Sequence, residues 1–397
     1  AVDMARDTEQ ALAQIMMLEQ AERDELLSLA YGGLSQSLHA LPLHKHFEQQ
    51  AEKQPTQIAV ADDTGDITYQ KLNCEANRVA RLLLEQGVNK GDFVAIGLER
   101  SCERVIATIA VLKIGAAFVP VDVTLPTDRI NFILDDAKPT CVIGFDGVVS
   151  AQLPYLSWSD IGQRSKAYCC DNLTYFTNQE LLDCAAYMMY TSGTTGMPKG
   201  VVVEHRQLHH FIEHCQHVYQ LSSNDRVLHF SSFSFDISIE EVFGSLCSGA
   251  SLVLRDDQCL LDSDYFWAYC ARHRVSVVSL PTAFWHQLVD HSKAMPPGSL
   301  RLVIVGGEAL NSETAEKWFG NPIAPDVINT YGPTETTVTA TSFRLTHETN
   351  FQKAIPIGTA NVDTHVYVLD RSMNLAPKGG LGEIYIGGDG VAHGYHN

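Results

Sequence analysis

The segment spanning residues 190–201 constrains this chain more than any other, because its residue types suit a tight, hydrogen-bonding turn. It reads YTSGTTGMPKGV. Its glycines permit backbone conformations and close approaches that a Cβ would block, and its hydroxyls donate hydrogen bonds beside exposed amides. Lys199 adds a positive charge. A loop of this kind is suited to holding phosphate, and the residues expected to contact it are Thr191, Ser192, Gly193, Thr194, Thr195 and Gly196.

The neighbouring residues place this loop at the end of a strand. Residues 185–189 are apolar and predict a buried strand, and α/β proteins bind ligands where strands end. The spacing is not that of a Walker A loop, because Pro198 precedes Lys199 and Gly200 follows it, so an ordinary P-loop nucleotidase is disfavoured. The alternative is a flexible glycine and threonine linker that binds nothing. The ordered Pro-Lys-Gly end of the segment argues against that alternative.

Strand-like and helix-like blocks alternate from residue 56 onward, which is typical of an α/β fold. Strands are expected at residues 58–61, 93–98, 275–280 and 302–305, and helices at residues 69–86 and 104–115. An amphipathic helix is expected before them, over residues 8–31, ended by Gly32 and Gly33. Taken alone, this first helix reads as an N-terminal cap.

Composition narrows the class of partner and the compartment. The 397 residues carry 28 basic and 47 acidic side chains, and the resulting net charge of −19 repels nucleic acid and anionic lipid. No apolar run approaches the roughly 18 residues of a membrane span. The first residues lack the pattern of a signal peptide. We therefore expect a cytoplasmic protein without a membrane or nucleic-acid partner.

Cysteine and histidine spacing give no firm metal site. The ten cysteines are scattered without a C-x-x-C pair, so reduced thiols are expected, and structural zinc is the weaker alternative. The pairs His205/His209 and His210/His214 have the i, i+4 spacing that could bind a metal on a helix. Because no H-E-x-x-H motif is present, a polar helix face is the favoured interpretation.

A second motif, NTYGPTETT at residues 329–337, supplies groups that a nucleotide needs. Tyr331 can lie against a flat base, and Asn329 offers a donor and an acceptor to the edge of that base. Thr334 can donate to a phosphate oxygen, and Glu335 supplies the hard carboxylate that Mg²⁺ prefers beside phosphates. A turn between two strands is the alternative. It would explain the central Gly-Pro pair but not the whole motif.

These two motifs resemble those of the adenylate-forming superfamily, which comprises acyl-CoA synthetases, luciferases and the adenylation domains of nonribosomal peptide synthetases. Residues 41–55, 67–72, 112–122 and 382–395 match further signatures of that superfamily. The resemblance implies the α/β fold of its large N-terminal subdomain, with two layered α/β sheets plus a small distorted β-barrel. This subdomain would span residues 41–397, and residues 1–40 look like the linker from an upstream domain. The small C-terminal subdomain of the family, with its catalytic lysine, has no counterpart in this sequence.

The resemblance also implies a reaction and partners. Members of the superfamily bind ATP and Mg²⁺ and join a carboxylic acid to AMP with release of pyrophosphate. Peptide synthetase members then load the acyl group onto the phosphopantetheine arm of a peptidyl carrier protein, beside neighbouring synthetase domains. Carried onto this sequence, the catalytic residues are Lys199, Thr334 and Glu335, the metal ligand is Glu335, and the adenine site is lined by Gly307, Glu308, Ala309, Asn329 and Tyr331.

Residues 235–238, which read FDIS, decide the class of acid. In the family this form belongs to amino-acid-activating members, whose aspartate pairs with the α-ammonium group of the substrate. A buried carboxylate needs a compensating cation, so Asp236 favours an α-amino acid over the substrate of an acyl-CoA ligase. Two alternatives stay open. The chain could be a fragment of an acid:CoA ligase, or a module that binds nucleotide and amino acid but does little catalysis by itself.

Alignment outward from these motifs gives the expected lining of the amino-acid pocket: Asp236, Glu240, Ser279, Val303, Val305, Thr330, Val338 and Thr339. Glu240 is the exception in a slot of small or apolar residues, because a second buried acid needs a cation or a strong donor on the substrate. Arginine fits best, and tyrosine could also reach. The Glu240 and Ser279 pair is similar to that of the first adenylation domain of cyanobacterial anabaenopeptin synthetases, which accept both. A Glu240 side chain turned to solvent is the alternative.

Overall fold

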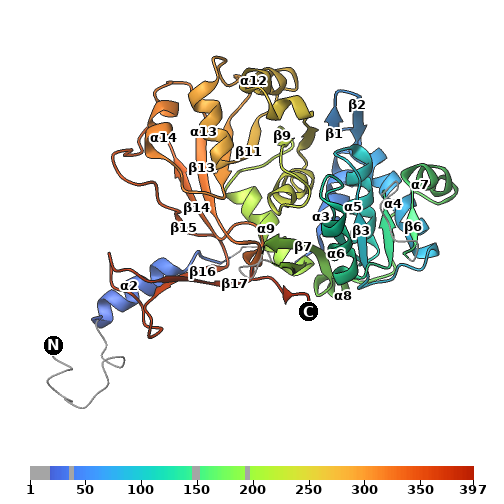
Figure 1. The fold of residues 1–397 in the computed structure, drawn as a ribbon, viewed down its shortest axis with the longest axis horizontal. Coiled ribbons are helices and arrows are strands. Elements are labelled where there is room, and N and C mark those ends of the chain that lie inside the picture. Colours follow the sequence, from blue (N-terminus) through green and yellow to red (C-terminus); the bar gives the residue numbers. More distant parts are fainter. Residues whose placement is uncertain (1–17, 35–39, 145–152, 193–196) are drawn as a thin grey trace, which may run out of the picture.

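The computed structural model describes residues 18–34, 40–144, 153–192 and 197–397, with only the backbone at Ser192. Two large sheets and their surrounding helices form the body of the chain, and one helix with a two-stranded ribbon lies to one side (Figure 1). In the described parts of the chain, no helix has the length and hydrophobicity needed for a transmembrane span.

The nine-stranded sheet is mostly parallel, with the order β15-β14-β13-β12-β11-β9-β10-β1-β2. Its parallel strands are β1 (Ile58–Asp62), β9 (Arg226–His229), β10 (Ser251–Leu254), β11 (Val277–Pro281), β12 (Leu302–Gly306) and β13 (Asp326–Tyr331). Its antiparallel edge strands are β2 (Gly65–Thr68), β14 (Thr341–Leu345) and β15 (Thr359–Ala360). Buried valines, leucines and isoleucines dominate β11 and β12, as expected for parallel strands that are covered on both faces.

The seven-stranded sheet has the order β18-β8-β7-β4-β3-β5-β6. Its parallel strands are β3 (Phe93–Ile96), β4 (Ala117–Pro120), β5 (Cys141–Ile143), β6 (Tyr155–Leu156) and β7 (Ala185–Ser192). Its antiparallel strands are β8 (Pro198–Glu204) and β18 (Gly394–Tyr395). The strands predicted near residues 58, 93, 275 and 302 are therefore confirmed, with ends that differ by a few residues.

Helices cover the sheets of the body. The longer ones are α3 (Leu43–Lys53), α4 (Tyr69–Glu85), α5 (Cys102–Lys113), α6 (Thr127–Ala137), α7 (Trp158–Arg164), α8 (Asn178–Leu182), α9 (His205–His217), α12 (Ser263–Arg272), α13 (Thr282–His291) and α14 (Ser312–Phe319). Short helical turns are η2 (Ser165–Ala167), α10 (Ile237–Ile239), η3 (Glu240–Gly244), α11 (Ser245–Cys247), η4 (Asp257–Leu260) and η5 (Thr334–Thr336). The side chains of Thr68 and Ser101 accept backbone hydrogen bonds at the starts of α4 and α5, so N-caps fix where the two predicted helices begin.

The two faces of the nine-stranded sheet pack against different cores. The larger cluster of buried apolar side chains lies where α4, α5 and α9 meet the two large sheets. The second cluster covers the opposite face of the nine-stranded sheet, beneath α12, α13 and α14, and includes Phe266, Trp285 and Trp318. Since successive residues of a strand point to opposite faces, the face that a residue occupies decides which core or site it can line.

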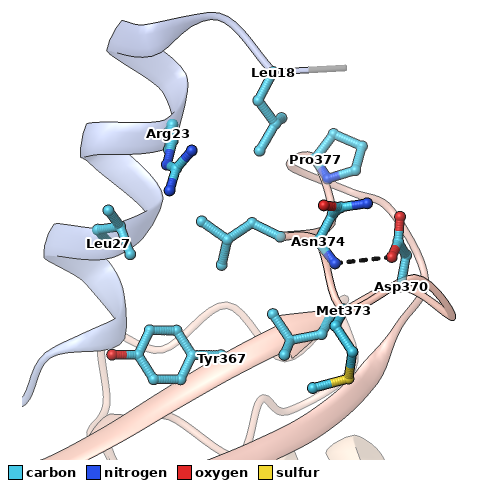
Figure 2. Close-up of a pocket in the computed structure, with 10 residues that line it drawn as sticks. Leu18, Arg23, Leu27, Tyr367, Asp370, Met373, Asn374 and Pro377 are labelled. Carbon is cyan, nitrogen blue, oxygen red and sulfur yellow. Dashed lines mark hydrogen bonds between the residues drawn. The ribbon is translucent and has the colours of Figure 1, made fainter. Parts of the chain in front are cut away.

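The helix α2 (Gln20–Ala30) lies along the ribbon formed by β16 (Thr364–Leu369) and β17 (Glu383–Gly388) (Figures 1 and 2). Among the described residues this ribbon has two strands, so the predicted small distorted β-barrel is not closed here. The predicted helix over residues 8–31 is confirmed from Gln20 to Ala30, and its first part lies outside the described residues. A cavity of about 360 Å³ separates α2 from the turn of the ribbon (Figure 2).

After α2 the chain passes through Gly32 and Gly33 and packs against the body. The amide of Gly32 donates to the carbonyl oxygen of Thr364 at 3.0 Å. A Cβ built on Gly32 would lie 1.8 Å from the carbonyl oxygen of Asn361. Gly33 adopts a φ of +87°, a conformation that glycine reaches without strain. Close backbone packing therefore requires glycine at position 32.

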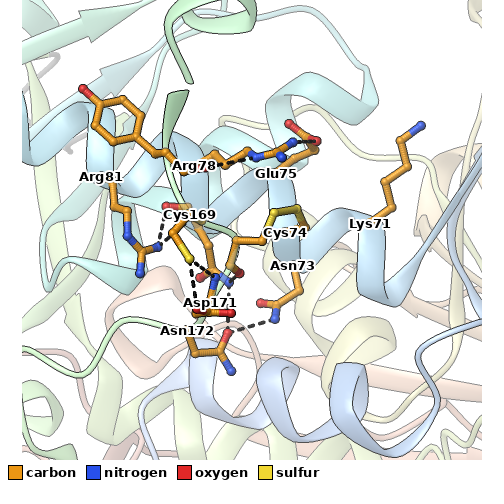
Figure 3. The surroundings of a disulfide bond; sticks show 12 residues. Lys71, Asn73, Cys74, Glu75, Arg78, Arg81, Cys169, Asp171 and Asn172 are labelled. Atoms are coloured by element: carbon orange, nitrogen blue, oxygen red, sulfur yellow. Dashed lines mark hydrogen bonds and ion pairs between the residues drawn. A yellow bond between two sulfur atoms is a disulfide. The ribbon is translucent and has the colours of Figure 1, made fainter. Parts of the chain in front are cut away.

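Cys74 and Cys170 form a disulfide, which corrects the expectation of reduced thiols for this pair (Figure 3). Cys74 lies on α4, and Asn77 of the same helix donates to the carbonyl oxygen of Cys170 at 2.6 Å. The two cysteines are 96 residues apart in the sequence, so their spacing gave no sign of this proximity. The other eight cysteines are free.

Candidate functional site

Residues from both large sheets meet at the candidate site. The strands β12 and β13 end at Gly306 and Tyr331, and η5 follows β13 directly. The strand β8, which carries Lys199, belongs to the other sheet and contacts η5. The site therefore lies beyond the carboxyl ends of parallel strands, where α/β folds bind their ligands.

The predicted phosphate loop connects two antiparallel strands. In the hairpin of β7 and β8, Thr191 is opposite Lys199 and Ser192 is opposite Pro198. The loop follows the buried strand β7, as its sequence predicted. The side chain of Ser192 and all of Gly193, Thr194, Thr195 and Gly196 lie outside the described residues. Their contacts with phosphate therefore stay predictions.

Tyr395 connects Lys199 with Glu335. The hydroxyl of Tyr395 donates to Oε1 of Glu335 at 2.6 Å, and Nζ of Lys199 lies 5.0 Å from the centre of the Tyr395 ring. The hydrogen bond to Glu335 is the main cause that raises the pKa of Tyr395. Lys199, which is predicted to contact phosphate, and Glu335, which is predicted to bind the metal, thus both contact Tyr395. Sequence analysis placed this tyrosine in a matching segment but gave it no role.

The residues predicted to surround adenine lie at the ends of β12 and β13. Gly307, Glu308 and Ala309 form an exposed turn after β12, with a φ of +91° at Gly307. Tyr331 is exposed at the end of β13, so its ring is accessible to a base. Asn329 is buried instead, and its amide group donates to the carbonyl oxygen of Pro356 at 2.8 Å. One donor of Asn329 is therefore already engaged within the protein.

A buried polar network positions the segment that carries Asp236. Glu241 accepts hydrogen bonds from the backbone and hydroxyl of Ser231 and lies 2.7 Å from Nδ1 of His229. Arg100 donates to the carbonyl oxygens of His229 and Ser231. Burial raises the pKa of Glu241 to about 8, although Arg100 and Ser231 oppose this shift. These contacts fix the path of the chain from β9 toward Asp236.

Asp236 faces the residues of the second motif. Burial is the main cause that raises its pKa, and the charge of Glu335 adds to the effect. The side chain of Thr334 lies close to Asp236 and acts in the opposite direction. The largest causes of the shift include no cationic side chain among the described residues. Thr334 is predicted to donate to phosphate, but in this structure it lies beside Asp236, the residue predicted to bind the ammonium group of the substrate.

Glu240 lies in the interior, with 3% of its surface exposed, which excludes the alternative that it turns to solvent. It begins the π-helical turn η3, a feature that often occurs at functional sites. Its Oε2 accepts a hydrogen bond from the hydroxyl of Tyr219 at 2.9 Å, while its Oε1 has no hydrogen-bond partner among the described residues. Burial raises the pKa of Glu240 to about 7, against the opposing effects of Ser279 and Tyr219.

Strand register shows which side chains share the face of Ser279. Ser279 is opposite Ile304, and Gly306 is opposite Thr330, in adjacent parallel strands. Cross-strand partners point to the same face of a sheet. Ile304 also belongs to the larger core cluster, on the side of the sheet where η3 packs. Ser279, Ile304, Gly306 and Thr330 therefore share one face of the sheet, the face on which the amino-acid pocket beside Glu240 is predicted.

Val303 and Val305 do not line this wall, which corrects their predicted role. Both are fully buried in the second core cluster, with Trp285 and Leu288 of α13. The alignment was one residue out of register along β12, and a shift of one residue moves a side chain to the other face of a sheet. Ile304 and Gly306 take their places.

The segment after η5 closes the pocket with an unusual backbone. Thr337 and Val338 have φ values of +56° and +69°, a region that β-branched residues rarely adopt. Val338 is buried in the larger core cluster, and Thr339 lies near Tyr219 and lowers the pKa of its hydroxyl. Both residues were predicted to line the pocket. Strained backbone of this kind persists where the surrounding structure enforces it, often at functional sites.

Comparison with known proteins agrees with these features. The family model described as AMP-binding enzyme matches residues 47–396. The dimodular nonribosomal peptide synthase of Bacillus subtilis (strain 168) is 36% identical over 394 residues, covering 97% of this chain and 16% of that protein. Tyrocidine synthase 1 of Brevibacillus parabrevis is 35% identical over 369 residues, covering 89% of this chain and 32% of that protein. The chain thus spans less than a third of the length of either relative.

Solved structures give the same fold. The nonribosomal peptide synthetase FmoA3 superposes with a TM-score of 0.86 at 25% identity, covering 96% of this chain and 41% of that one. The four-domain synthetase holo-AB3403, bound to AMP and glycine, gives a TM-score of 0.85 at 27% identity and covers 100% of this chain and 29% of that one. The N-terminal subdomain of Klebsiella oxytoca NpsA gives 0.79 at 25% identity and covers 90% of both chains. With its fold, its two motifs and the family match, this chain belongs to the family of AMP-binding enzymes.

Proposed function

We propose that this chain is the large subdomain of an adenylation domain that activates an α-amino acid as its adenylate, with release of pyrophosphate. The observation that carries this proposal is Asp236, a half-buried carboxylate at the end of the predicted nucleotide site, whose pKa is raised mainly by its loss of solvent. It neighbours Thr334 and Glu335 but has no cationic partner among the described residues. A substrate ammonium group would supply that partner.

ATP would be the second substrate. Relatives with this fold have been solved with an ATP analogue and with AMP, so nucleotide binding is expected of the fold. In this chain, the exposed Tyr331 offers a face to the base, and Lys199 offers a charge to the phosphates. The exposed turn at Gly307, Glu308 and Ala309 would lie along one edge of the adenine ring.

The residues fit a Mg²⁺ ion that accompanies the nucleotide. Glu335 offers a carboxylate at the point where Lys199 and Asp236 converge, and oxygen ligands of this kind suit Mg²⁺ when it also binds phosphate. When bound, such an ion would neutralise charge on the phosphate oxygens. The hydrogen bond from Tyr395 keeps Glu335 aimed along this edge of the site.

The proposed chemistry needs no nucleophile from the protein. A carboxylate oxygen of the amino acid attacks the α-phosphorus of ATP, the bond from that phosphorus to the bridging oxygen breaks, and pyrophosphate leaves with the electron pair. Asp236 would hold the ammonium group so that the carboxylate reaches the α-phosphorus, and Lys199 would stabilise charge on the phosphates. Positioning and charge stabilisation account for most catalysis of this type.

The preferred amino acid would be arginine, with tyrosine second. Glu240 offers one unpartnered carboxylate oxygen deep in the pocket, and the wall around it is built from Ser279, Ile304 and Val338. A guanidinium group at the end of an apolar stem matches this arrangement, and a phenol could donate to the same oxygen. The narrower resemblance to anabaenopeptin synthetases stays a prediction.

The product would pass to a peptidyl carrier protein within a larger synthetase. The relatives support this proposal, since this chain covers only a small part of their length and holo-AB3403 is a four-domain synthetase. Residues 41–397 would then form the large subdomain, with residues before 41 as linker.

Amino-acid-dependent exchange of labelled pyrophosphate into ATP, measured over all twenty amino acids, tests the proposal. We expect exchange with arginine and weaker exchange with tyrosine. Exchange that needs no amino acid, or exchange only with fatty or aryl acids, would contradict amino-acid activation. Exchange with leucine or valine alone would contradict only the proposed substrate.

A further inference from the structure

Tyr219 contacts the pocket, although no sequence motif pointed to it. It lies just after α9 and is fully buried. Its hydroxyl donates to Oε2 of Glu240 at 2.9 Å. We propose that Tyr219 is a positioning residue for substrate choice, which holds one oxygen of Glu240 and leaves the other free for the distal group of the amino acid. This inference rests on the amino-acid-activating function proposed above.

The hydroxyl of Tyr219 supports the charged form of Glu240. It donates to Oε2 of Glu240 at 2.9 Å, and a donated hydrogen bond favours the charged form of a carboxylate. Oγ1 of Thr339, which lies near Tyr219, accepts from the side-chain amide of Asn361 at 3.3 Å.

The backbone of Tyr219 is fixed from the other side. Both terminal nitrogens of Arg301 donate to the carbonyl oxygen of Tyr219 at 3.1 Å. Arg301 is held in turn by two hydrogen bonds to Asp225, at 2.7 Å and 2.9 Å. The ring of His214 packs edge to face against Tyr219 with 4.8 Å between ring centres. Tyr219 therefore presents its hydroxyl at a fixed point, whatever occupies the pocket.

The free oxygen of Glu240 has no cation near it in the described structure. The titratable groups that interact with Glu240 are Asp236, Glu241, Cys215 and Tyr219, and none of these carries a positive charge. Burial first, and then the charge of Glu240, raise the pKa of Tyr219 well above its usual value, so its hydroxyl stays protonated and available as a donor. Among the described residues no side chain supplies a compensating cation, so a cation bound in the pocket would be the partner of Glu240.

A purely structural role for Tyr219 makes a different prediction. Buried tyrosines usually find a hydrogen-bond partner, and losing that bond would then cost stability without changing substrate choice. Tyr269 provides the matched control, because it is 1% exposed and its hydroxyl donates to the carbonyl oxygen of Leu254 at 2.6 Å, in the second core cluster. Y269F should lose a comparable bond without touching Glu240.

The first experiment measures Glu240 without any substrate. The pH dependence of unfolding in urea is compared between the parent and E240Q, and the difference gives the apparent pKa of Glu240. The same comparison is repeated with Y219F and E240Q/Y219F. We expect the apparent pKa to rise above about 7 by at least about one pH unit when the Tyr219 hydroxyl is absent. Y269F should leave the apparent pKa of Glu240 unchanged.

The second experiment measures substrate choice by amino-acid-dependent pyrophosphate exchange. Y219F should raise KM for arginine by at least about tenfold with a smaller change in kcat, since a charge-assisted contact is weakened. In the E240Q background, Y219F should have no further effect on KM. An unchanged apparent pKa together with an unchanged KM, or the same changes in Y269F, would overturn the role of Tyr219. If the parent activates no amino acid, the proposed function fails, and the substrate-free measurement alone decides the role of Tyr219.

Discussion

Replacing Glu240 by glutamine tests how the pocket chooses its substrate. Glutamine keeps the size and shape of the side chain, and its carbonyl oxygen can still accept from Tyr219 where Oε2 does so now, at 2.9 Å. Its NH₂ group then takes the place of Oε1, which has no partner among the described residues. The free position of the pocket changes from an acceptor into a donor. A guanidinium group would face a donor and lose its counter-charge.

The size of the effect follows from the interaction that is lost. A hydrogen bond to a charged group contributes about 1.5 to 3 kcal/mol, and about 1.4 kcal/mol corresponds to a factor of ten. E240Q should therefore lower kcat/KM for arginine by about ten- to a hundredfold. The pKa of Glu240 is raised to about 7, so its charged form predominates only above that pH. Arginine activation by the parent should rise with pH through about 7, and this dependence should vanish in E240Q.

Citrulline provides the control substrate, because it matches arginine in shape but carries a neutral urea group. The ratio of kcat/KM for arginine to that for citrulline, from pyrophosphate exchange at about pH 8, should fall by at least about tenfold in E240Q. E313Q, an exposed glutamate at the start of α14, should leave the ratio unchanged. A ratio that stays the same in E240Q would show that Glu240 does not contact the distal group, and the arginine proposal would fall.

Three further predictions concern the other parts of the site and the fold. D236A should abolish amino-acid-dependent exchange, while its affinity for ATP, measured by calorimetry, should change little. Normal amino-acid binding by this variant would contradict the role of Asp236. Y395F should raise the Mg²⁺ concentration needed for half-maximal exchange, because Glu335 loses the hydrogen bond that orients its carboxylate. An unchanged Mg²⁺ dependence would argue against Glu335 as a ligand. Burial lowers the pKa of His214 to about 3, so the unfolded chain binds a proton that the folded chain does not, and stability is lost as pH falls below about 6.5. H214F should therefore lose about 2 kcal/mol less than the parent between about pH 6.5 and pH 5 in urea unfolding, and equal losses in the two proteins would refute the assignment.

Local patterns predicted the fold and the nucleotide end of the site. Alternating apolar blocks gave the parallel strands, since their burial requires continuous hydrophobic runs. The two motifs placed Lys199, Thr334 and Glu335, residues 235–238 placed Asp236, and the structure brings these residues together. Each motif carries its own turn residues and chemistry, so a short stretch of sequence contains the information needed.

Contacts between distant segments were not predictable in the same way. Tyr219 and Tyr395 reach Glu240 and Glu335 only through the packing of separate elements. No local pattern marks Tyr219, and the matching segment that contains Tyr395 gave no sign of its contact with Glu335. The error at Val303 and Val305 has a different cause. Their strand is hydrophobic on both faces, so periodicity could not show which residues face the pocket. A polar face would have revealed the register.

Asn361 joins the pocket to the segment that follows α2. Its carbonyl oxygen lies against Gly32, at a point where even a methyl group has no room, and its side chain donates to the carbonyl oxygen of Thr339 at 3.0 Å. Asn361 thus contacts Gly32 through its backbone and Thr339 through its side chain. A shift of the chain at Gly32 would therefore press on Asn361, and through its side-chain hydrogen bond on Thr339, so these two distant segments are held in place by a single residue.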